Sequence, residues 1–163
     1  MKPSLMTSIL AAVFVVWPGG VCAGEIISVD AAGGGDFTSI QAAIDSAANG
    51  DEIVVAPGTY DEAITFYGKA VRLRSSGGPA ITTIDGTGHY HVVRCVSYEN
   101  RDTILEGFTI TGGNANGSVD PDAFGGGILI IDSSPRVTGC IFTANAAIGY
   151  GGGGCTLKTA ARL

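Results

Sequence analysis

Leu105-Glu-Gly-Phe-Thr-Ile110 resembles a later segment, Val137-Thr-Gly-Cys-Ile-Phe142, and this imperfect repetition decides the fold. The central glycines of the two segments, Gly107 and Gly139, are 32 residues apart. A period of this length indicates a solenoid, in which each repeat packs only against its neighbours. Because the repeated unit contains strand-like residues and no helix, the sequence predicts an all-β chain that coils into a parallel β-helix.

Short strand-like segments separated by glycine-rich turns extend in both directions from this repeat. Residues 70–74 alternate clearly, with Val71 and Leu73 on one face and Arg72 and Arg74 on the other. The strands are predicted at residues 25–29, 51–56, 63–66, 70–74, 82–84, 91–96, 103–111, 127–131 and 136–143.

One helix is predicted near the start of this array. Thr38 and Gln41 have the spacing of a capping box, with Thr38 as the N-cap residue and Gln41 reaching back to its amide. Asn49-Gly50 is expected to end the helix. We expect this short N-terminal helix to cap the β-helix by covering the open edge of its first coil, because an open edge has unpaired backbone groups. Its apolar face consists of Ile40, Ala43, Ile44 and Ala47.

The first 23 residues have the pattern of a secretory signal peptide. Lys2 supplies the positive charge, residues 9–17 form an apolar core, and Val21-Cys22-Ala23 provides small residues before a cut at Gly24. The apolar run is shorter than the ~20 residues that a membrane span needs. We therefore expect a secreted, extracellular or cell-surface protein with no membrane segment after cleavage.

Residues 24–163 are predicted to form the N-terminal part of a β-helix domain. The glycine run at 151–154 is expected to precede an apolar strand, as the run at 125–127 does, but the chain continues as Cys-Thr-Leu-Lys-Thr-Ala-Ala-Arg-Leu. We take this as a departure from the repeat and expect further C-terminal coils to be missing, as in a fragment or a truncated, non-functional gene product.

Composition excludes some classes of partner. The formal net charge is −6, and Lys and Arg are not clustered. Nucleic acids and anionic membranes attract basic patches, so neither is an expected partner. The oligomeric state stays open.

Three cysteines, Cys95, Cys140 and Cys155, follow the leader. Cys95 and Cys140 lie in strand-like segments, which favours small buried core residues over a disulfide. An odd number excludes complete pairing within one chain, and the pairing of the three stays open.

Residues 33–88, GGGDFTSIQAAIDSAANGDEIVVAPGTYDEAITFYGKAVRLRSSGGPAITTIDGTG, resemble the N-terminal region of bacterial β-helix proteins of the pectin-lyase-like superfamily. The helix, the Pro-Gly-Thr-Tyr turn and the Thr-Ile-Asp-Gly end occur there in this order. The resemblance implies a right-handed parallel β-helix. Enzymes of this superfamily use aspartate pairs or calcium-binding acids with a basic residue, and none of those motifs is matched here. No catalytic residue is therefore predicted, because fold alone does not define an activity.

Arginines are the first candidate binding residues. Arg72 and Arg74 share a strand face, and Arg94 is expected in a similar row on a later coil. Arginines in a row can pair with uronate carboxylates, which makes an extracellular polysaccharide a candidate partner. The alternative is an ordinary charged outer face.

A long polar loop is the second candidate. Asn114, Asn116, Asp120 and Asp122 offer the oxygen ligands that calcium prefers, so calcium is a candidate ligand of this loop and no other cofactor is expected. The alternative is a solvated turn, in which Asn and Asp form local backbone hydrogen bonds.

Histidines and tyrosines complete the candidates. His89 and His91 would share one face of a strand, as a metal pair or a general base. Tyrosines can either stack on sugar rings or pack at coil corners. The residues concerned are Tyr60, Tyr67, Tyr90 and Tyr98.

Taken together, the sequence favours a secreted β-helix module with a structural, adhesion or polysaccharide-binding role and no catalysis of its own. The alternative is a fragment of a polysaccharide-acting lyase or esterase. The absence of catalytic motifs leans against an enzyme without deciding the question.

Overall fold

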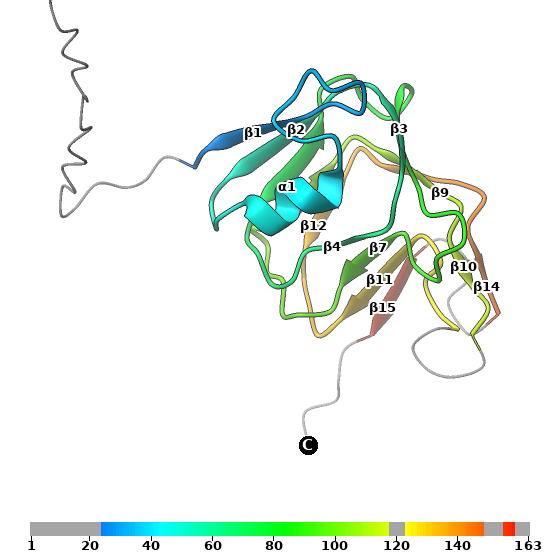
Figure 1. Ribbon diagram of the computed structural model, residues 1–163. Helices are drawn as coiled ribbons and strands as arrows, with labels where there is room; N and C mark the ends of the chain where they lie inside the picture. Colours follow the sequence, from blue (N-terminus) through cyan, green and yellow to red (C-terminus); the bar gives the residue numbers. More distant parts are fainter. Residues whose placement is uncertain (1–23, 118–122, 149–154, 159–163) are drawn as a thin grey trace, which may run out of the picture.

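A computed structural model describes residues 24–117, 123–148 and 155–158 of the chain. These residues are predominantly β, with parallel sheets and one helix, α1 (Ile40–Ser46) (Figure 1). The predicted all-β class with one short helix therefore fits the structure. The predicted signal peptide, residues 1–23, lies outside the described residues, in which no helix is long and apolar enough to cross a membrane.

Most strands belong to three sheets. The first sheet has the order β1 (Ile26–Val29), β2 (Glu52–Val55), β5 (Arg72–Ser75), β8 (Ile104–Glu106) and β12 (Arg136–Thr138). The second has the order β3 (Gly58–Asp61), β6 (Thr82–Asp85), β9 (Thr109–Thr111) and β13 (Ile141–Phe142). The third has the order β4 (Ile64–Thr65), β7 (Val93–Cys95), β11 (Ile128–Ile131) and β15 (Cys155–Lys158). A small fourth sheet pairs β10 (Asn114–Ala115) with β14 (Ala146–Ala147).

Successive strands of the chain belong to the first, second and third sheet in turn. β2, β3 and β4 are followed by β5, β6 and β7, and each new strand pairs in parallel with its counterpart one turn earlier. β12 pairs with β8 so that Val137 lies beside Leu105, which is the 32-residue spacing seen in the sequence. Stacked turns of this kind are compatible with a β-helix-like solenoid.

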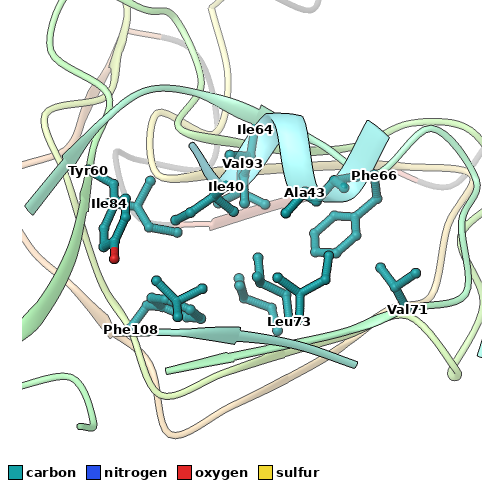
Figure 2. Packing of buried hydrophobic residues seen from close by; sticks show 14 of the residues in the cluster. Ile40, Ala43, Tyr60, Ile64, Phe66, Val71, Leu73, Ile84, Val93 and Phe108 are labelled. Atoms are coloured by element: carbon teal, nitrogen blue, oxygen red, sulfur yellow. The ribbon is translucent and has the colours of Figure 1, made fainter. Parts of the chain in front are cut away.

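Inward-facing side chains stack in rows from one turn to the next, and they form the core. Figure 2 shows Leu73, Ile84, Val93 and Phe108 converging on a common interior. The row of the first sheet comprises Ile27, Ile53, Leu73, Leu105 and Val137. The row of the second comprises Tyr60, Ile84, Ile110 and Phe142.

Two predicted strands, 103–111 and 136–143, are each divided in two. Gly107 and Gly139 stand at the breaks, with φ of 79° and 60°. These angles belong to the left-handed region that glycine tolerates, and they turn the chain from the first sheet into the second. A single extended strand across either glycine is therefore a wrong prediction.

Other strands were not predicted. β3 begins at Gly58, in the Pro-Gly-Thr-Tyr segment predicted to be a turn, and β10 and β14 are two-residue strands. The stretch after Gly154, taken as a departure from the repeat, forms β15 and pairs in register with β11. Parallel pairing requires only an extended backbone, so the third sheet continues there despite the change in sequence.

The beginning of α1 differs from the predicted capping box. The N-cap residue is Ser39, whose Oγ accepts from the Ala42 amide at 3.3 Å, and not Thr38. The amides of Ile40 and Gln41, which lie in the first turn and have no partner within the helix, donate to the Glu62 carboxylate at 2.7 and 2.9 Å. With Ser39 as the N-cap residue, Gln41 is the second residue of the helix and not the third that a capping box uses, and its side chain hydrogen-bonds Asp45 and the backbone of Thr65.

The helix ends at Ser46, before the predicted Asn49-Gly50 stop, because Ala47 is already extended. Lys69 holds this end: its Nζ donates to the carbonyls of Ile44, Asp45 and Ala47 at 2.7, 2.7 and 2.9 Å. An acid at the first turn and an ammonium at the last both complement the helix dipole. Glu62 and Lys69 both belong to the first full turn of the solenoid.

The apolar face of α1 packs onto the interior as expected for a cap. Ile40, Ala43 and Ile44 are fully buried, and the helix contacts β1, β2 and β4. Figure 2 shows the side chains of Ile40 and Ala43 pointing from the helix into the interior that Ile64 and Phe66 also line.

We predict that Lys69→Met lowers the free energy of unfolding by about 2 kcal/mol, because three charge-assisted hydrogen bonds to α1 are lost. Urea denaturation measures this difference. Arg94→Met, which removes an exposed cation with no ion pair among the described residues, is the matched control and should change stability by less than about 0.5 kcal/mol. Equal effects of the two variants would contradict the role of Lys69.

Candidate functional site

Arg72 and Arg74 share the outer face of β5, as predicted, but both are engaged in ion pairs. The Nε and Nη2 atoms of Arg72 donate to Glu106 at 3.1 and 2.7 Å, and its Nη1 lies 3.6 Å from Glu52. Arg74 donates to Glu52. The hydrogen bond to Glu106 raises the pKa of Arg72. A polyanion at this face would have to compete with two carboxylates of the protein itself.

Arg94 does not continue this row. It is exposed on β7, in the third sheet, where its neighbours in register are Thr65 and Leu129. The bends between β5 and β6 and between β6 and β7 separate Arg94 from Arg72 and Arg74, so Arg94 lies on the same turn in a different sheet and not in a similar row on a later turn. The residue in register with Arg72 two turns later is Arg136.

Arg136 lines a hollow of about 460 Å³ on the last turns of the described chain. The hollow combines a second arginine, two serines and three apolar residues, and its described lining residues are Arg101, Ile130, Ser133, Ser134, Pro135, Arg136 and Val137. Within residues 24–117, 123–148 and 155–158, neither Arg101 nor Arg136 has an ion-pair partner, and both are exposed. Concave sites with a few convergent polar groups are typical binding sites.

Sequence reasoning did not find this hollow. Arg101 lies in the irregular connection between β7 and β8, where no periodicity applies. Arg136 could have been found from the 32-residue repeat, which places it beside Ile104 and in the row of Arg72.

The buried carboxylate of Glu99 lies at the corner beside the hollow and accepts hydrogen bonds there. Glu99 is 1% exposed and accepts from the amides of Gly68 and Ser97 at 2.9 and 2.8 Å and from Ser133 Oγ at 2.7 Å. Burial by itself raises the pKa of Glu99, but these donors outweigh it and hold the pKa below its usual value. The carboxylate thereby ties together residues from three successive turns.

The tyrosines divide into one buried and three exposed residues. Tyr60 is buried and donates its hydroxyl to the Ala56 carbonyl at 3.0 Å. Tyr67, Tyr90 and Tyr98 are 62%, 50% and 80% exposed. Stacking on a ligand is thus available to the last three and not to Tyr60.

The proposed calcium ligands are only partly described. Asn116 Nδ2 donates to Asn114 Oδ1, which is a local contact of the kind expected in a polar turn. Asp120 and Asp122 lie outside the described residues. Within the described ranges, no group of three or more His, Cys, Asp or Glu side chains could hold a metal ion. Calcium binding stays a prediction.

The histidines do not share a strand face. Both precede β7, and His89 is exposed while His91 is buried with Nδ1 3.1 Å from the Gly125 carbonyl oxygen. The condition for a histidine pair, a strand through both residues, is therefore not met.

Two of the cysteines pack in the apolar interior, as predicted. Cys95 is 1% exposed, and Cys140 is half-buried against the core. Burial raises the pKa of the Cys140 thiol, which keeps it protonated at neutral pH. Cys155 lies in β15.

The sequence matches no protein-family model and no curated protein. A functional assignment therefore rests on the fold and on the arrangement of its side chains.

We predict that Glu99→Gln lowers the free energy of unfolding by about 2 kcal/mol at pH 7, since an amide group replaces an acceptor of three hydrogen bonds. The folded-state pKa of Glu99 is depressed, so its contribution is complete above the unfolded pKa of about 4.3 and is lost as the pH falls further. The difference from wild type should therefore shrink below about pH 4.

Urea denaturation across this pH range measures the effect, with Glu25→Gln, an exposed glutamate, as the control. A difference that stays constant down to pH 3 or so would show that Glu99 is not the titrating group.

Proposed function

We propose that this chain is a right-handed parallel β-helix of the pectin-lyase-like kind, which is exported and binds an acidic extracellular polysaccharide without cleaving it. The resemblance of residues 33–88, the leader-like residues 1–23 and the three parallel sheets support the fold and the location. The ligand class follows from the residues that line the hollow.

The observation that carries the proposal is a pair of arginines in one hollow, Arg101 and Arg136, neither of which has an ion-pair partner among the residues that the structure describes. A guanidinium group binds a carboxylate through two parallel hydrogen bonds, and uronic acids present one carboxylate per sugar. Ser134 adds an exposed hydroxyl, while the partly exposed Pro135 and Val137 offer apolar atoms to the ring. These are the complementary features of a uronate residue.

The row of Arg72 and Arg74 is a weaker candidate for the same ligand. Glu52 and Glu106 neutralise these arginines and would repel an incoming carboxylate. Binding there must first break existing ion pairs, which is not required at Arg101 and Arg136.

The lining of the hollow supports binding rather than hydrolysis. Glycoside hydrolysis uses two carboxyl groups that flank the scissile bond. Among the described residues that line the hollow are Arg, Ser, Pro, Ile and Val, and no Asp, Glu or His belongs to this described part of the lining.

The test is titration of the purified protein with oligogalacturonates at low ionic strength. Arg101→Gln and Arg136→Gln should each weaken binding about tenfold or more, because each removes a charge-assisted contact of roughly 1.5–3 kcal/mol. Arg72→Gln is the matched control and should change the Kd by less than about threefold.

Added salt should weaken wild-type binding and should have less effect on the double variant Arg101→Gln/Arg136→Gln. Binding that is unchanged in this double variant would contradict the site. Release of shortened or unsaturated oligosaccharides would contradict the non-catalytic assignment and favour a polysaccharide-acting enzyme.

A further inference from the structure

Tyr67 and Tyr98 occupy the same corner on two successive turns. Tyr67 follows β4 and Tyr98 follows β7, and these strands are paired neighbours in the third sheet. The Gly68 amide, next to Tyr67, donates to the side chain of Glu99, next to Tyr98, at 2.9 Å. The two tyrosines therefore flank one contact between adjacent turns.

Neither burial nor backbone preference accounts for tyrosine at these positions. The two residues are 62% and 80% exposed, so their rings add little to the core. Their φ angles, 52° and 62°, lie in the left-handed region, which costs a residue with a side chain roughly 1–2 kcal/mol.

The next turn shows what the corner itself requires. Asp132, after β11, has φ of 51°, and Asp and Asn adopt this conformation more readily than aromatic residues do. Within the described chain, neither tyrosine side chain has a hydrogen bond or a ring contact. A strained backbone that holds an exposed ring with no partner in the described part of the chain points to contact with a ligand.

We propose that Tyr67 and Tyr98 form a stacking platform for consecutive sugar rings of the bound polysaccharide, an inference that rests on the proposed function. Aromatic rings pack on the apolar face of a pyranose, and adjacent turns are about 4.8 Å apart, close to the length of one sugar unit. A chain that runs along the solenoid axis can contact both rings.

The platform and the arginine hollow belong to one corner. Arg101 follows Tyr98 in the same connection between β7 and β8, and Ser133, which lines the hollow, hydrogen-bonds Glu99 at 2.7 Å. The direction of the polysaccharide follows from this arrangement: it passes from Tyr67 over Tyr98 to Arg101 and Arg136, across successive turns.

The test uses Tyr67→Asn and Tyr98→Asn, because asparagine suits the left-handed backbone and should leave the thermal midpoint unchanged or higher. The double variant should bind oligogalacturonate about tenfold more weakly. Tyr90→Asn removes a 50%-exposed tyrosine that lies ahead of β7, and it should bind as wild type does.

Tyr67→Phe/Tyr98→Phe keeps both rings and should keep the wild-type affinity, which distinguishes stacking from hydrogen bonding by the hydroxyls. Ring resonances of Tyr67 and Tyr98 should shift on titration of the wild-type protein, a measurement that does not depend on any variant.

Several outcomes would overturn the inference. If Arg101→Gln/Arg136→Gln loses binding while the tyrosine double variant keeps it, the platform is wrong and the proposed function stands. If the ring resonances of Tyr67 and Tyr98 stay unshifted when the wild-type protein is saturated with ligand, the platform is likewise wrong and the proposed function stands. If the wild-type protein binds no acidic polysaccharide, both the platform and the proposed function are wrong.

Discussion

The register between successive turns is the constraint on which the rest of the structure depends. Parallel pairing sets Leu73 beside Leu105 and Leu105 beside Val137, so each inward apolar side chain packs on another apolar side chain. A slip of one residue would turn this apolar row outward and bring charged side chains such as Arg72 into the core. The outer ion pairs and the aligned corners both follow from the same register.

Much of the fold could be predicted because this register leaves a period in the sequence. The 32-residue repeat corresponds to one turn, and strand alternation placed Arg72 and Arg74 correctly on the outside. The ends of α1 could not be predicted, because the groups that fix them, Glu62 and Lys69, are 21 or more residues away from the amides and carbonyls that they bind. A local capping pattern carries no information about such distant partners.

The candidate site was harder to predict for a related reason. Alternation tells which side chains share a face within one strand, but it does not carry across a corner of irregular length. Arg94 was misplaced for this reason, and Arg101 has no position in any repeat. The positive φ of Tyr98 is also invisible in the sequence, since nothing in the residue type announces a left-handed backbone.

The anchoring of α1 by Glu62 and Lys69 has a consequence for the order of events when the protein is made. The helix is seven residues long, too short to be stable in water before it docks. Both of its anchors are synthesised after it, so a chain that leaves the ribosome from its N-terminus has to wait for residue 69 before the cap can close. Assembly would then begin with the helix and the first full turn as one unit, onto which each later turn is added as it appears.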